Sequence, residues 1–163
     1  MIAVLVNTKK VTGRRKLRFE SYKELLSDVE QLAAAEVQTL GNWSFGQILK
    51  HLAVAVDSMI DGGPFSLPVP VRFLMNFMMK KRMLTRTLSP GFKLPKSARA
   101  LVPDEISVEE GLGLLRAAID RLDKETKRAP HGAFGELSPL EWDQFQLRHC
   151  EMHLSFVVPV DAG

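Results

Sequence analysis

Residues 138–157 read SPLEWDQFQLRHCEMHLSFV, and this stretch carries the local chemistry that decides the fold. Ser138 and Glu141 have the spacing of a capping box, in which the serine oxygen accepts a free backbone N–H and the acidic side chain reaches back. Pro139 suits the first helical position because no hydrogen bond is lost there. The apolar residues that follow have helical spacing, so we predict a helix over 138–157.

Three further segments open with the same chemistry. Their capping pairs are Ser21 with Glu24, Ser44 with Gln47, and Ser107 with Glu110. Each pair precedes a run of apolar residues at helical spacing, which predicts helices over 21–35, 44–61 and 107–128. Few segments have the pattern of a β-strand, and the pattern indicates a short hairpin within 1–19. The sequence therefore predicts an all-α fold.

The composition fits one soluble domain over 1–163. Apolar residues make up 45% of the chain and charged residues 25%, which excludes wholesale disorder. The one cysteine, Cys150, excludes an internal disulfide framework and a multi-cysteine zinc site. The net charge of +3 is too small to indicate nucleic-acid binding. No apolar run is long enough to cross a bilayer and no export signal is recognisable, so we expect a cytoplasmic protein without an integral membrane segment.

The segment 62–106 differs from the rest of the chain because it holds six of the nine prolines. Within it, 69–84 is predicted to form a short fifth helix. A long crossover of this kind connects non-sequential neighbours in some four-helix bundles. We therefore interpret 62–106 as a crossover insertion and 1–20 as an N-terminal arm, whose basic cluster at 14–16 we expect to be solvated.

The end of that fifth helix, over 75–83, is both basic and rich in methionine. Three roles fit this composition: covering a pocket, packing against a second subunit of a homodimer, or lying on a membrane surface. We favour the first two.

Two of the four histidines, His149 and His153, lie four residues apart in the last predicted helix. That spacing places both imidazoles on one face, where they can bind one ion. The same core-facing arc contains Trp142, Phe145, Gln146 and Phe156. Glu151 is predicted to point the opposite way, to solvent. The alternative interpretation is a pair of core histidines that hydrogen bonds satisfy.

His51 lies at the edge of an apolar stripe in the second predicted helix, where it would face a groove between helices. Taken alone, it is better explained as a structural histidine. Taken with His149 and His153, it completes a site of three imidazoles, which suits Zn, Ni, Cu or Fe. Three protein ligands leave a position open for water or substrate, and without a carboxylate the ion would strongly acidify a bound water.

Two other residues near this pair carry chemistry. His131 stands in the loop before the last helix, where it could serve as a fourth ligand, an acid/base, a substrate contact or a packed loop residue. Cys150 points about 80° away from the histidine pair. We therefore predict a small packed thiol at Cys150 rather than a metal ligand.

The motif W-x-x-x-Q-x-x-x-H, formed by Trp43, Gln47 and His51, resembles the DinB/YfiT-like superfamily when it is joined by H-x-x-x-H in the last helix. Longer strings look like one branch of it, known only as a domain of unknown function. These strings are TGRRKLRF (12–19), LGNWSFGQILKHLA (40–53) and H-x-x-FG-x-LSPLEW (131–142). The resemblance covers nearly the whole chain.

The resemblance implies a four-helix bundle with up-up-down-down connectivity, often dimeric. It also implies a divalent metal, commonly nickel or zinc, held by three histidines that match His51, His149 and His153. The sequence departs from the branch at Met152, where relatives often carry a further histidine, and at Gly132, where proline commonly follows the loop histidine.

Characterised members of the superfamily include thiol-cofactor S-transferases, a mycothiol-dependent isomerase and presumed metal-dependent hydrolases. The resemblance thus implies a metal-dependent enzyme that acts on a small molecule, by transfer to or from a low-molecular-weight thiol or by hydrolysis. We take His131 as the catalytic candidate, and Gln47 and Gln146 as residues that orient ligands or contact a cofactor or substrate. The rival hypothesis is a non-catalytic bundle that binds a metal or a small apolar ligand.

Overall fold

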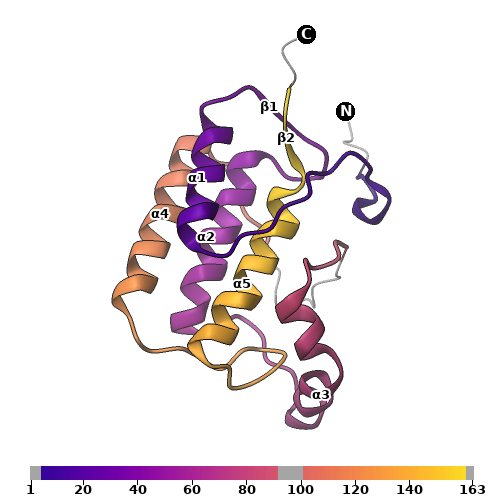
Figure 1. The fold of residues 1–163 in the computed structure, drawn as a ribbon, viewed down its shortest axis with the longest axis vertical. Coiled ribbons are helices and arrows are strands. Elements are labelled where there is room, and N and C mark those ends of the chain that lie inside the picture. Colours follow the sequence, from indigo (N-terminus) through magenta and orange to yellow (C-terminus); the bar gives the residue numbers. More distant parts are fainter. Residues whose placement is uncertain (1–4, 92–100, 161–163) are drawn as a thin grey trace.

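The computed structural model describes residues 5–91 and 101–160, which form a predominantly helical fold (Figure 1). Over these residues it contains five α-helices, one short 3-10 helix (η1, Thr8–Lys10) and a two-stranded sheet. The α-helices are α1 (Tyr22–Ala33), α2 (Phe45–Asp61), α3 (Val69–Thr85), α4 (Val108–Lys124) and α5 (Pro139–Leu154). None of the helices in the described part of the chain has the length and apolar character needed to span a membrane.

The helix starts follow the capping chemistry. Both halves of the capping box are present at the starts of α2, α4 and α5. At α1, the Ser21 side chain accepts the Glu24 N–H, but the Glu24 carboxylate accepts the N–H of Glu20 instead of that of Ser21. Each of these helices begins within one residue of its predicted range. The helix expected over 69–84 is also present, although α3 is as long as α2 and α4 rather than short.

The sheet is a feature that the sequence pattern did not predict. β1 (Val37–Thr39) pairs antiparallel with β2 (Val157–Pro159), so the last predicted helix ends earlier than expected, at Leu154. Strands of three residues are too short to show an alternating pattern. The hairpin expected within 1–19 is wrong over residues 5–19, whose one regular element is η1, and residues 1–4 lie outside the described part.

The N-terminal arm is anchored at Arg15 rather than solvated. The Arg15 guanidinium makes two hydrogen bonds with the Asp28 carboxylate, at 2.7 and 2.8 Å. It also donates to the carbonyls of Val157, at 2.7 Å, and Leu154, at 3.3 Å. Carbonyls at a helix C-terminus lack partners within the helix, so this arginine supplies the donors that the end of α5 needs.

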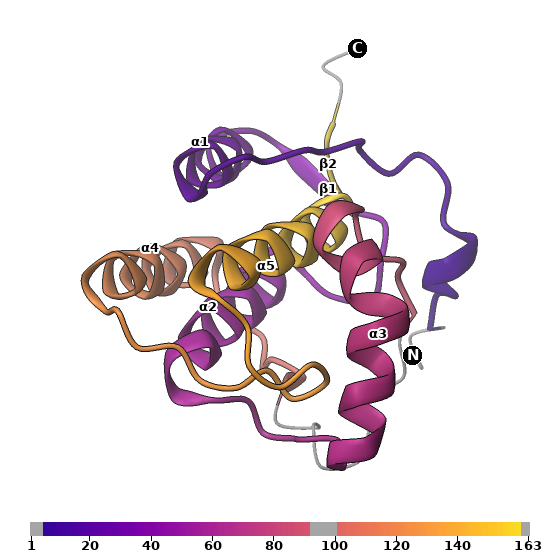
Figure 2. The same ribbon diagram turned by 60° about the horizontal axis from the view of Figure 1, so that its bottom comes forward.

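The helices are arranged so that α1, α2, α4 and α5 pack against one another, while α3 lies outside them against α5 (Figures 1 and 2). A Cβ at Gly111 of α4 would lie 2.8 Å from the Leu49 Cβ of α2, so the glycine permits the close approach of these two helices. Core side chains with no exposed surface include Leu25, Val29, Leu49, Leu52, Val56, Leu115 and Leu154.

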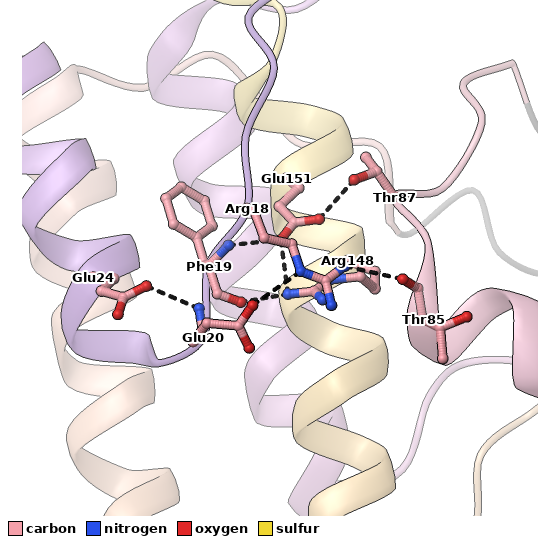
Figure 3. A network of polar contacts seen from close by, with 8 residues as sticks. All are labelled: Arg18, Phe19, Glu20, Glu24, Thr85, Thr87, Arg148 and Glu151. Atoms are coloured by element: carbon pink, nitrogen blue, oxygen red, sulfur yellow. Dashed lines mark hydrogen bonds and ion pairs between the residues drawn. The ribbon is translucent and has the colours of Figure 1, made fainter.

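Glu151, which the helical spacing placed in solvent, is fully buried. Its carboxylate pairs with Arg148 at 2.7 Å and accepts hydrogen bonds from the Phe19 N–H at 2.8 Å and the Thr87 hydroxyl at 2.7 Å (Figure 3). Arg148 in turn donates to the Phe19 carbonyl. The prediction was wrong because the N-terminal arm and the residues after α3 cover this side of α5. The network ties both segments to α5.

We predict that Arg148→Met lowers the free energy of unfolding by about 3–5 kcal/mol, because Glu151 is left buried without its cation. Combining it with Glu151→Gln removes the charge but keeps the hydrogen-bond acceptor, and should recover at least half of that loss. Urea unfolding measures both changes. Lys124→Met, which breaks the exposed pair of Lys124 with Asp120, is the control and should change stability little. Equal effects of the buried and exposed substitutions would contradict the prediction.

Candidate metal centre

His51 of α2 and His149 and His153 of α5 converge on one point, and their ligand nitrogens all lie within 4.8 Å of one another. His149 Nε2 lies 3.4 Å from His51 Nε2 and 3.0 Å from His153 Nε2. Two nitrogens that bind one ion at about 2.1 Å lie about 3.0 Å apart at a right angle and about 3.4 Å apart at a tetrahedral angle. The histidine triad, as we call these three residues, could therefore hold a metal ion.

Backbone groups orient His51 within the triad. Its Nδ1 lies 2.9 Å from the carbonyl oxygen of Leu101, which accepts a hydrogen bond but cannot donate one. The proton of the neutral ring is therefore on Nδ1, and the Nε2 lone pair faces the other two histidines. Leu101 belongs to the segment before α4, so this segment selects the tautomer that a metal ion needs.

Gln47 contacts the same segment from outside the pocket. Its side-chain oxygen accepts the Ser44 N–H in the capping box, and its amide donates to the Pro103 carbonyl at 2.9 Å. Gln47 does not line the pocket beside the triad. It instead holds the chain two residues from Leu101, which is the partner of His51.

Aromatic rings fix the other two ligands. The Trp43 ring stacks on His153, with 5.4 Å between centroids and 5° between planes. Phe145 stacks on His149 at 6.2 Å. Trp43 stands in the motif with Gln47 and His51, but nothing in that motif indicates that its ring contacts a histidine of α5. The His149 Nδ1 is buried and has no hydrogen-bond partner among the described residues.

The triad is neutral at pH 7. Burial, followed by the nearby charges of His51 and His131, lowers the pKa of His149 to about 3. Burial and the other two ligands hold the pKa of His153 well below its usual range, and burial also lowers the pKa of His51. A neutral imidazole is the form that binds a metal ion, so no proton has to be displaced at neutral pH.

A pocket of about 760 Å³ lies beside the triad. Its walls are mostly apolar, and the larger side chains are Trp43, Ile48, Phe65, Met75, Met79, Met83, Trp142, Phe145 and Phe156. The arc of α5 that was expected to face the core lines this pocket. Three methionines of α3 form the opposite wall, which is the first of the three roles predicted for 75–83.

The charged residues of the lining are all basic. Arg82 and Arg86 reach the pocket from the end of α3. Arg82 belongs to the basic segment 75–83, for which covering a pocket was one predicted role, whereas sequence reasoning did not identify Arg86. Among the described residues, the lining contains no Asp or Glu. An anionic group on a bound molecule would therefore be attracted to this side of the pocket.

His131 and Gln146 also line the pocket but do not belong to the triad. The His131 Nδ1 accepts the backbone N–H groups of Ala133 at 3.1 Å and Phe134 at 3.2 Å, so the proton is on Nε2. Burial lowers the pKa of His131 to about 4. Gln146 is buried, and its amide lies 3.7 Å from the Cys150 sulfur.

Cys150 is a packed thiol, as the helical spacing predicted. It is fully buried and is not among the residues grouped around the candidate ion. Burial raises the pKa of its thiol to about 12. A thiol in this environment is not ionised at neutral pH and is a poor nucleophile.

A comparison with known families matches residues 11–160 to a family described as "Protein of unknown function (DUF1569)". The chain belongs to the DUF1569 family. The expected membership of a family of unknown function is thereby confirmed, whereas the wider relationship to the DinB/YfiT-like superfamily stays a prediction. No curated protein and no solved structure matches the chain significantly. The function of this DUF1569 protein must therefore be argued from its site.

We predict that His131 makes the metal-free DUF1569 protein less stable in acid. The unfolded state takes up a proton at this residue below about pH 6.5, whereas the folded state resists it until pH falls to about 4. Stability is therefore lost as pH falls through this window. In His131→Gln, the decrease in unfolding free energy between pH 7 and pH 5 should be smaller than in the wild type by about 1–2 kcal/mol. Urea unfolding of chelator-treated protein measures it, and identical decreases in both proteins would contradict the prediction.

Proposed function

We propose that this protein is a divalent-metal-dependent enzyme that acts on a small molecule in the pocket beside the histidine triad. One observation carries the proposal: three neutral imidazoles, with nitrogens spaced for one ion, line the wall of a pocket of about 760 Å³. Structural zinc sites are usually closed by four protein ligands, while catalytic sites keep a position open. A pocket of this volume admits a small organic molecule.

The resemblance implies zinc or nickel, and the donor set fits both, because imidazole binds them and no carboxylate is grouped with the histidines. When bound, such an ion supplies Lewis-acid chemistry and lowers the pKa of a thiol or water that reaches it. The protein contributes the orientation of the ligands. Leu101 holds the ring of His51, and Trp43 holds the ring of His153.

Of the two candidate reactions, the pocket favours transfer involving a thiol over hydrolysis. Hydrolysis commonly uses a histidine or a carboxylate as general base, and the described lining has no carboxylate. His131 is not a ready base either, because its Nδ1 already accepts two N–H groups and its Nε2 carries the proton. A thiol has an ordinary pKa of about 8.5 and loses its proton far more easily than water.

The remaining lining residues fit the two substrates of such a reaction. Arg86 provides positive charge for an anionic group, such as a carboxylate on a low-molecular-weight thiol. The apolar walls suit an apolar electrophile. His131 would then donate a hydrogen bond from Nε2 to the electrophile or its leaving group, and Gln146 would contact the bound molecules.

We also propose that α1, α2, α4 and α5 form a DinB-like four-helix bundle with up-up-down-down connectivity, in which 62–106 is the crossover. The mutual packing of these four helices and the outlying position of α3 support this arrangement. The two helices that supply the ligands, α2 and α5, are in direct contact.

We predict that the untagged protein, offered zinc or nickel and then dialysed, retains about one equivalent of metal per chain. His51→Ala and His149→Ala should each retain less than about a tenth of that, because each removes one of three ligands. His131→Ala is the matched control, since it removes a histidine from the same pocket but outside the triad, and it should retain the metal. Elemental analysis measures the content. A folded wild type that binds neither metal would overturn the proposal.

The reaction is tested on the same samples by following loss of a thiol in the presence of a fluorogenic alkylating reagent. Metal-loaded wild type should accelerate the loss of the thiol. With His149→Ala, the thiol should disappear only at the uncatalysed rate. Release of p-nitrophenol from an ester with no effect on the thiol would favour the hydrolase. A metal-loaded protein that does neither, yet binds an apolar fluorophore in the pocket, would favour the non-catalytic alternative.

A further inference from the structure

Helix α3 has two apolar faces with different surroundings. The inner face packs on α5, lines the pocket with methionines and is fixed by the Asn76 amide, which donates to the Phe134 carbonyl at 2.8 Å. The outer face carries Phe73, which is 77% exposed, and Phe77, which is 85% exposed. Other exposed apolar side chains of this helix are Val69, Val71, Leu74 and Met78. Contiguous exposed apolar surface of this kind marks an interaction site.

The charged residues of α3 and of the segments beside it in the sequence are all basic. Residues 62–91 contain five basic residues and no acidic one, although the whole chain carries a net charge of only +3. Lys80 pairs with Glu141 across to α5. Lys81 and Arg82 are exposed in the last turns of α3, and neither forms an ion pair with any described residue. Lys81 follows Phe73 and Phe77 at four-residue intervals, so all three lie along one side of the helix.

We propose that the outer face of α3 docks on an anionic lipid bilayer. Aromatic and aliphatic side chains enter the boundary between headgroups and acyl chains, and Lys81 and Arg82 contact the lipid phosphates. The charge selects this occupant over a second copy of the chain, because the same acid-free face of another copy offers no carboxylate to these two cations. The docking is to the surface, since no described helix can span the membrane.

The experiment is flotation of the full chain with two kinds of vesicle, phosphatidylcholine alone and phosphatidylcholine mixed with phosphatidylglycerol. We expect the wild type to float with the mixed vesicles and to bind neutral vesicles at least about tenfold less. Lys81→Gln with Arg82→Gln should weaken binding to the mixed vesicles about thirtyfold. Phe73→Ser with Phe77→Ser should abolish it. These side chains are exposed, so circular dichroism should show an unchanged fold.

Two matched control pairs test whether binding depends on this face of α3 or on exposed apolar and basic side chains in general. Leu114→Ser with Leu140→Ser removes exposed apolar side chains from α4 and α5, and Lys23→Gln with Lys127→Gln removes two exposed charges elsewhere. Both pairs should bind as the wild type does.

Three results would overturn the proposal. The first is a wild type that does not float with anionic vesicles even at low salt, and the second is an equal loss of binding in the control pairs. The third is a dimer, seen by analytical ultracentrifugation, that Phe73→Ser with Phe77→Ser dissociates while vesicle binding is absent, which would assign the face to self-association. None of these residues is in the triad, so metal content measured on the same samples reports on the proposed enzyme separately.

Discussion

The arrangement on which the site depends is the meeting of three imidazole nitrogens in an environment that keeps them uncharged. His149 Nε2 faces two other Nε2 atoms at 3.4 and 3.0 Å, and burial lowers the pKa of all three rings. A neutral imidazole has a single N–H, and that of His51 is directed at the Leu101 carbonyl. The three facing nitrogens therefore cannot all be paired with one another, which is unfavourable unless a cation satisfies their lone pairs. An arrangement of this kind could hold a metal ion.

The rest of the structure keeps α2 and α5 in the rotation that this arrangement requires. Along α5, Arg148 and Glu151 alternate with the two ligands and form a buried network on the other side of the helix. Rotation of α5 about its axis would break that network and the triad together. On α2, Gln47 completes the capping box at the start of the helix and holds the segment that orients His51. The histidines of the triad are thus positioned in part by contacts that lie outside the pocket.

Local chemistry explains which parts of this structure the sequence predicts. A capping box such as Ser138 with Glu141 acts within one helical turn, so the helix starts are predicted closely. The four-residue spacing of the two ligands in α5 is equally local. Glu151 and Arg15 were assigned to solvent because their partners are distant in sequence: Thr87 lies 64 residues from Glu151, and Leu154 lies 139 residues from Arg15. Helical spacing indicates which way a side chain points, but not what covers it.

Helix α3 lies between the pocket and the surface of the molecule. A helix that is apolar on both sides needs a partner on each, and within the described chain α3 has one, on its inner side. Its diameter, about 10 Å with side chains, is then the whole separation between the pocket and whatever covers its outer face. If that partner is a bilayer, molecules dissolved among acyl chains have a short route to a wall of flexible methionines, which adapt to varied shapes. In that case, an apolar electrophile that partitions into membranes would match this site better than a polar metabolite.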